Sequence, residues 1–122
     1  MSTGVHGCAG RFYESDISLA PDALPSRFGE EVVPVGTAIY FLLERGSVSR
    51  WHRIASDETW HFHLGGPLVV SEAWVADGKV CRKETVLGAN LAAGQTLAHV
   101  VPAGRWFGAH VPMDASEYAL GA

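Results

Sequence analysis

Seven strand-length apolar segments follow one another between residues 37 and 111, separated by short connections rich in glycine, serine and aspartate. They are the segments 37–43, 48–54, 58–64, 67–75, 79–87, 96–101 and 106–111. Val, Ile, Leu, Trp and Phe dominate these segments, and no apolar stripe of helical spacing exceeds two turns. The pair Asp77-Gly78 between WVA and KVC predicts a hairpin, because a type I′ turn needs positive φ at both positions. Together these features predict an all-β barrel or sandwich, preceded by a loop over 19–31, where two prolines and a glycine occur.

The composition is that of one globular domain spanning residues 1–122, with 48% hydrophobic and 18% charged residues. A formal charge of −4 and nine scattered basic residues argue against nucleic-acid binding. The apolar run 37–43 is far shorter than the roughly 20 residues of a membrane-spanning helix, so no membrane association is expected. The N-terminus lacks the basic and apolar regions of a signal peptide, and we expect a cytoplasmic protein.

The stretch SRWHRIASDETWHFH (residues 49–63) concentrates three of the six histidines. Alternate side chains of a strand share a face, and the short connection 55–57 would let the two flanking strands pair antiparallel. That pairing places His52 and Glu58 on one interior face. An imidazole and a carboxylate so placed can share a divalent metal or serve as an acid/base pair, with a structural hydrogen-bonded pair as the alternative.

The same alternation assigns the neighbouring side chains. Arg50 lies on the face of His52, where it would bind a carboxylate or phosphate group or pair with Glu58. His61 and His63 point away from Glu58, and they become metal ligands only if a β-bulge re-aims them. Further candidates for substrate binding, each with core packing or a surface position as its alternative, are Tyr40, Trp60, Phe62, His99, Trp106 and Phe107.

The spacing of Gly46, His52, Ile54, Glu58 and Gly65 resembles the first cupin motif, and Pro102-Ala103-Gly104 resembles part of the second. Beyond these motifs, TAIYFLLERGSVSRWHRIASDETWHFHLG, VVPAGRWFGA and RFYESDIS ahead of LPSRFG are similar to a small cupin family of unknown function, often labelled the fifth cupin family. The resemblance covers most of the chain. It implies the cupin double-stranded β-helix, a jelly-roll barrel.

Departures from the cupin pattern bear on the cofactor and on the oligomer. Ile54 and Phe107 stand where metal-binding cupins carry histidines, so only His52 and Glu58 remain of the four-ligand set and a divalent metal is a candidate cofactor with two protein ligands. The resemblance also implies that the family's N-terminal helix and last strand are absent, either naturally or because the chain is shortened. An uncovered sheet edge would then be protected in a homodimer.

Two classes of function remain open for a small-molecule ligand in the barrel. In an enzyme, His52 would act as general base while Glu58 orients it or serves as the acid. By analogy with metal-poor sugar-nucleotide epimerases of the superfamily, the reaction would be isomerisation, epimerisation, dehydration or cyclisation of a small carbonyl-bearing metabolite. The alternatives are a metal-dependent enzyme, a non-catalytic metabolite-binding barrel, and a purely structural barrel.

Overall fold

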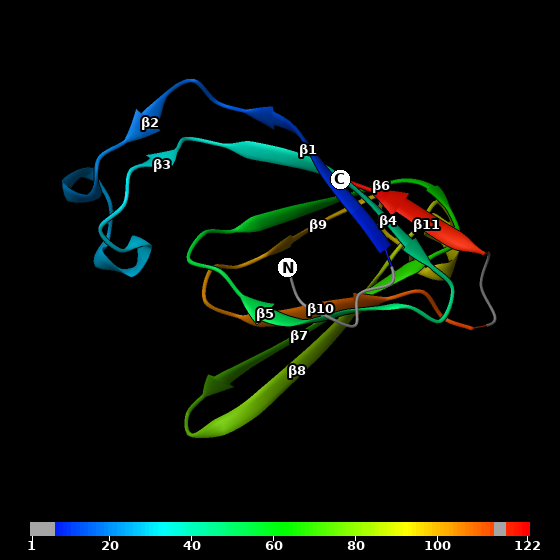
Figure 1. Cartoon of the computed structure of the whole chain (residues 1–122). Helices are drawn as coiled ribbons and strands as arrows, with labels where there is room; N and C mark the ends of the chain where they lie inside the picture. Colours follow the sequence, from blue (N-terminus) through cyan, green and yellow to red (C-terminus); the bar gives the residue numbers. More distant parts are fainter. Residues whose placement is uncertain (1–6, 114–116) are drawn as a thin grey trace.

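The computed structural model describes residues 7–113 and 117–122, and within them the chain is all-β (Figure 1). Its strands are β1 (Gly7–Glu14), β2 (Ser18–Leu19), β3 (Val33–Pro34), β4 (Thr37–Glu44), β5 (Val48–Arg53), β6 (Glu58–Gly65), β7 (Leu68–Ala76), β8 (Lys79–Leu87), β9 (Ala98–Val101), β10 (Trp106–His110) and β11 (Tyr118–Gly121). Three short 3₁₀ turns are η1 (Pro21–Ala23), η2 (Ser26–Phe28) and η3 (Leu91–Ala93). No helix in the described ranges is long and apolar enough to cross a membrane.

Two antiparallel sheets enclose the interior. One has the order β1-β4-β11-β6-β9 and the other the order β5-β10-β7-β8, which is consistent with a jelly-roll barrel. The short pair β2-β3 and the turns η1 and η2 form an arm that extends from the end of β1 and β4 (Figure 1). The connections β5–β6 and β9–β10 lie at the same end of the barrel as this arm, and we call that end the mouth (Figure 1).

The seven strands expected from the sequence are all present, with ends shifted by no more than two residues. The Asp77-Gly78 hairpin is confirmed: it joins β7 to β8 with φ of 51° and 74°, as a type I′ turn requires. The expected loop over 19–31 contains the turns η1 and η2. β1, β2 and β3 precede the seven expected segments, and β11 follows them and lies between β4 and β6 inside the five-stranded sheet.

The pairing expected between the two histidine-bearing strands is wrong. β5 pairs with β10 in one sheet, while β6 pairs with β9 and β11 in the other. The connection between β5 and β6 crosses from sheet to sheet because its polar groups bind the turn before β10: Gly104 N donates to Ile54 O at 3.0 Å, and Ala103 N donates to Asp57 Oδ1 at 2.8 Å. His52 and Glu58 therefore belong to opposite sheets at the mouth.

The core fills the space between the sheets. It contains Leu43, Trp60, Leu68, Val70, Leu87, Val101, Phe107, Ala109, Val111 and Ala119. The ring of Phe107, which is fully buried, contacts that of Trp60 from the opposite sheet edge-on, with centroids 6.3 Å apart. This aromatic contact packs the two sheets together directly behind the mouth.

Candidate acid/base site

His52 lies at the rim of the mouth, on the interior face of β5. It is the register partner of Phe107 on β10, and the centroids of the two rings lie 4.2 Å apart. Its Nδ1 is 2.9 Å from the carbonyl oxygen of Arg50. Because a carbonyl only accepts hydrogen bonds, Nδ1 must carry a proton, and the neutral ring then presents a lone pair at Nε2. The imidazole is exposed, so Nε2 is accessible as a base.

Glu58 begins β6 and faces His52 from the other sheet. Burial raises the pKa of its carboxyl above the ordinary value of 4.5, whereas the nearby His52 and the indole of Trp60 oppose that shift. The indole lies near the carboxyl without completing a hydrogen bond, since Trp60 Nε1 is buried and has no partner. A half-buried carboxyl beside an imidazole is suited to hold and deliver a proton.

Aromatic side chains line the barrel interior behind this pair. Trp60 is 8% exposed, and it packs edge-on against Phe41 of β4 at 5.1 Å between ring centroids. Phe62, two residues further along β6, packs against the same core. Three of the candidate substrate-binding residues, Trp60, Phe62 and Phe107, thus line the barrel interior behind the mouth.

A second polar cluster faces the interior from β7 and β9. The side chain of Glu72 is 0% exposed, and its two oxygens accept hydrogen bonds from His99 Nε2 at 2.6 Å and from an Arg105 terminal nitrogen at 3.0 Å. Thr85 Oγ1 lies 3.5 Å from His99 Nε2. Arg105 also stacks on the ring of Trp74, 3.6 Å from its centroid. His99, one of the candidates for substrate binding, is therefore held by a buried carboxylate.

Sequence reasoning did not select Glu72, Trp74, Thr85 or Arg105. Glu72 carried a usable signal, because in LVVSEAW it alternates with Leu68 and Val70 on what the pattern marks as the apolar face. An acid on such a face needs a buried partner. Arg105 had no comparable signal, since it lies in the turn outside the regular alternation.

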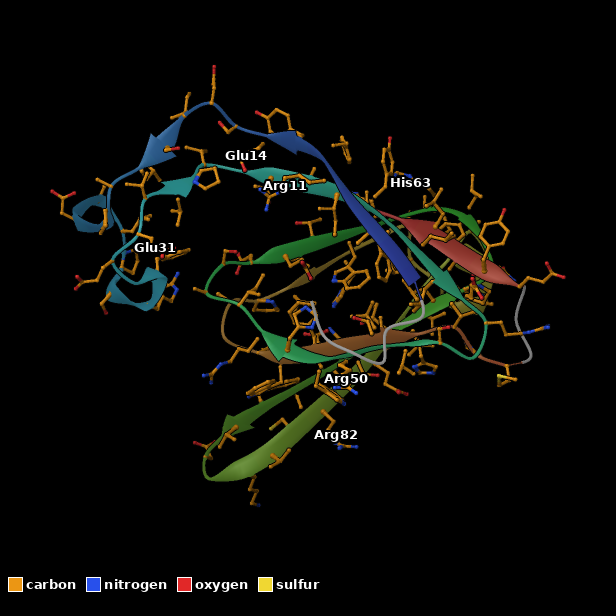
Figure 2. All side chains as sticks on the ribbon, in the orientation of Figure 1. Arg11, Glu14, Glu31, Arg50, His63 and Arg82 are labelled. Carbon is orange, nitrogen blue, oxygen red and sulfur yellow. The ribbon has the colours of Figure 1, made fainter. Side chains whose placement is uncertain are left out.

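Arg50 does not lie on the face of His52, contrary to expectation. β10 pairs Phe107 with His52 and Ala109 with Ser49, so two residues of β5, Arg50 and Trp51, lie opposite Gly108 in a bulge. The bulge turns Arg50 outward, and no ion pair joins it to Glu58 among the described residues. In Figure 2 Arg50 lies at the lower side of the view with Arg82 of β8.

Tyr40 and Trp106 are also outside the interior. Tyr40 is 49% exposed and stacks on Phe12 at 4.4 Å between centroids. Trp106 is 46% exposed and lies beneath the guanidinium of Arg53, 5.3 Å from the ring centroid. Both residues alternate with interior neighbours, Phe41 and Phe107, so the pleat directs them outward.

His61 and His63 are exposed on the outer side of the five-stranded sheet. β6 does contain an irregularity at this point: Leu120 and Gly121 of β11 pair with Leu64 and Phe62, which leaves His63 as the extra residue. The irregularity does not bring His63 to Glu58; instead His63 contacts Tyr40, with centroids 5.8 Å apart. His63 is seen at the upper side of Figure 2, opposite Arg50.

A concavity of about 460 Å³ lies on the outer side of the four-stranded sheet. Arg50, Trp51, Ser71 and His110 contribute to its lining around Gly108. The concavity is separate from the interior pair His52 and Glu58.

The residues of the mouth do not fit a tightly bound divalent metal. Within the described ranges no group of three or more His, Cys, Asp or Glu side chains is close enough to bind one ion. Ile54 is a hydrocarbon and Phe107 is a buried ring 4.2 Å from His52, so neither adds a ligand to His52 and Glu58. The mouth therefore offers two protein ligands, one fewer than typical catalytic metal sites supply.

Comparisons with known proteins agree with the architecture. A family model described as Cupin superfamily (DUF985) matches residues 5–121. Among solved structures, a hypothetical protein from Leishmania major is similar at 26% identity and a TM-score of 0.78, with 93% of this chain and 67% of that chain covered. A protein from Shewanella oneidensis is similar at 31% identity and a TM-score of 0.70, with 93% and 62% covered. No curated protein matches the chain.

Proposed function

Since the chain belongs to the DUF985 family of the cupin superfamily, we propose a function from the geometry of the mouth of its barrel. That function is acid/base catalysis on a small carbonyl-bearing metabolite. The main support for this proposal is that His52 and Glu58 lie near each other at the mouth. The Nε2 lone pair of His52 is accessible, and burial raises the pKa of Glu58. The reaction class is isomerisation or epimerisation, with dehydration or cyclisation as variants of the same first step.

In the first step, Nε2 of His52 removes a proton from the carbon next to the substrate carbonyl. The electron pair of that C–H bond becomes the C=C bond of an enol, and the carbonyl oxygen takes the proton of Glu58. Return of the proton from the imidazolium to the same face of that carbon regenerates the substrate, so epimerisation requires the enol to turn and present its opposite face to His52. In an α-hydroxy carbonyl compound, delivery of the proton to the former carbonyl carbon moves the carbonyl by one position, and the proton of the α-hydroxyl goes to Glu58. In both cases Glu58 regains a proton from an oxygen of the enol, so protons and electrons balance over the cycle.

The surroundings of the pair favour this chemistry over a purely structural contact. The hydrogen bond from His52 Nδ1 to Arg50 O fixes the tautomer and ring orientation, which a general base requires. A raised pKa keeps more of Glu58 protonated near neutral pH than an exposed glutamate would be. The buried and unpartnered Nε1 of Trp60 offers a further donor beside the carboxyl for a substrate oxygen.

The test is exchange of substrate C–H protons in D₂O, followed by proton NMR on a panel of keto sugar nucleotides and small carbonyl compounds including pyruvate. It detects the first step without knowledge of the product. We expect the parent protein to accelerate exchange of at least one compound. His52→Gln and Glu58→Gln should each slow that exchange by about 10²-fold or more while the fold is retained.

Two exposed residues provide matched controls. His61 lies on the outer side of the sheet that carries Glu58, and Glu44 lies at the end of β4. His61→Gln and Glu44→Gln should therefore accelerate proton exchange of the substrate as the parent does. The catalytic proposal would be contradicted if the protein accelerated proton exchange of no compound in the panel, or if the site variants and the parent gave equal exchange rates. The binding of a metabolite would then remain as the alternative.

A further inference from the structure

The buried carboxylate of Glu72 is fully engaged by protein groups. One oxygen accepts from His99 and the other from Arg105, at 2.6 and 3.0 Å. A charged carboxylate with 0% exposure is costly unless it is paired and hydrogen-bonded, and these two partners meet that demand. Glu72 therefore acts as an anchor for the side chains around it, and it has no free oxygen for a ligand.

Arg105 is held from two sides and keeps most of its donors free. One terminal nitrogen binds Glu72, and the plane of the guanidinium rests on Trp74. Arginine carries five N–H donors, and the described residues supply this group with one acceptor only. The Arg105 side chain is 27% exposed whereas that of Glu72 is 0% exposed, so the guanidinium is accessible to solvent although the carboxylate that holds it is not. A guanidinium fixed in this way loses little conformational entropy on binding an anion.

Arg105 belongs to the same mouth as His52 and Glu58. It follows the turn Pro102-Ala103-Gly104, which binds the β5–β6 connection between these two residues through Ile54 O. Phe107, two residues later, is the register partner of both His52 and Glu72. The strands thus bring the guanidinium and the acid/base pair to one end of the barrel interior.

We propose that Arg105, positioned by Glu72 and Trp74, binds a carboxylate or phosphate group of the molecule that enters the mouth. Planar guanidinium groups bind both anions through paired N–H donors. Combined with the proposed function, on which this part rests, the substrate class is a small carbonyl compound with one anionic group. The binding site itself does not depend on turnover.

The experiment measures binding to the whole chain by isothermal titration calorimetry. The probes are pyruvate, hydroxyacetone phosphate and methyl pyruvate, which present a carboxylate, a phosphate and no charge beside a similar carbonyl. We expect one of the two anions to bind with a Kd below about 10 mM and methyl pyruvate to bind at least about tenfold more weakly. The anion that binds more tightly shows whether the site prefers a carboxylate or a phosphate group.

Variants separate recognition from folding. Arg105→Gln should weaken binding of the preferred anion by about tenfold to a hundredfold, and Arg105→Lys, which keeps a cation next to Glu72, should weaken it less. Arg53→Gln is the matched control, because Arg53 also stacks on a tryptophan but on the outer side of the sheet, and it should bind as the parent does. Circular dichroism and Tm check the fold of each variant.

Three results would overturn the inference. The parent protein could bind neither anion, or it could bind pyruvate and methyl pyruvate equally while it does not bind hydroxyacetone phosphate. The third is that Arg105→Lys and Arg105→Gln both fold and bind the preferred anion as tightly as the parent does. Failure of the proposed function is distinct from these results. Anion binding that depends on Arg105, with no proton exchange in D₂O, would remove the catalytic proposal and keep the anion site.

Discussion

At the scale of single residues, two glutamates inside one barrel have opposite surroundings. Glu72 is fully buried between an arginine and a histidine, which meet both of its oxygens. Glu58 has a histidine nearby and an indole that does not complete a hydrogen bond. Because desolvation dominates at Glu58, burial raises the pKa of this carboxyl, and this is why our proposal assigns the role of proton donor to it.

The raised pKa of Glu58 makes a prediction about stability. Above the ordinary value of 4.5 the unfolded chain loses this proton before the folded protein does, so the folded state binds more protons over that window. The free energy of unfolding contributed by Glu58 is therefore greatest at low pH and falls as pH rises through the raised pKa. Glu58→Gln, which stays neutral, should escape this fall.

The measurement is Tm of the parent and of Glu58→Gln between pH 4 and 8. The difference in Tm should move in favour of the variant as pH rises from about 4.5. Glu44→Gln, at an exposed position, should follow the parent at every pH. A difference between parent and Glu58→Gln that is constant with pH would mean that burial does not govern this carboxyl.

At the scale of elements, regular alternation explains most of the interior and fails at the bulge of β5. It correctly separates Trp60 and Phe62 from His61 on β6. On β5 it assigns Arg50 to the wrong face, because a bulge opposite Gly108 inserts one residue. Bulges arise from the register that partner strands impose, which neighbouring residues in the sequence do not encode.

The candidate site, like the fold, could be predicted from the sequence only in part. His52 and Glu58 follow from motif spacing, although the pairing expected to join them is wrong, and their roles remain predictions. The cluster around Glu72 joins β7, β9 and the turn before β10, and nothing local in the sequence specifies which strands meet. Of this cluster only His99 was a candidate from the sequence, whereas Glu72 and Arg105, which it joins through tertiary structure, were missed.

The bulge of β5 can be tested through Gly108. A Cβ at this position would lie 2.8 Å from Ser49 O on the bulged strand, closer than side chains approach backbone. Gly108→Ala should therefore reduce the free energy of unfolding by about 1–3 kcal/mol, measured by urea denaturation. Gly10→Ala in β1 is the matched control, because its Cβ meets no atom within 4 Å. Equal stability of the two variants would show that β5 can yield without cost.

At the scale of the whole molecule, each of the two larger sheets ends in a strand that pairs with one neighbour among the described residues. β1 is an edge strand of the five-stranded sheet, and β5 is an edge strand of the four-stranded sheet. Open edges of this kind promote pairing with another chain. A homodimer that covers one of them remains our prediction for the oligomeric state.

Light scattering on the purified protein measures this directly. A dimer has twice the 13.0 kDa of the chain, and its mass should persist on dilution if an edge is paired. A mass of 13.0 kDa across a tenfold range of concentration would mean that the edges are tolerated without a partner.

The turn that joins Arg105 to the β5–β6 connection has a consequence for how the protein acquires its site. The residues of the mouth run from His52 to Arg105 along the chain, and they meet only when both sheets have closed. Closing loops of this length costs entropy before any contact compensates for it, and chains dominated by such distant contacts fold slowly. We therefore expect the mouth to form late in refolding, after local hairpins such as β7–β8 have paired.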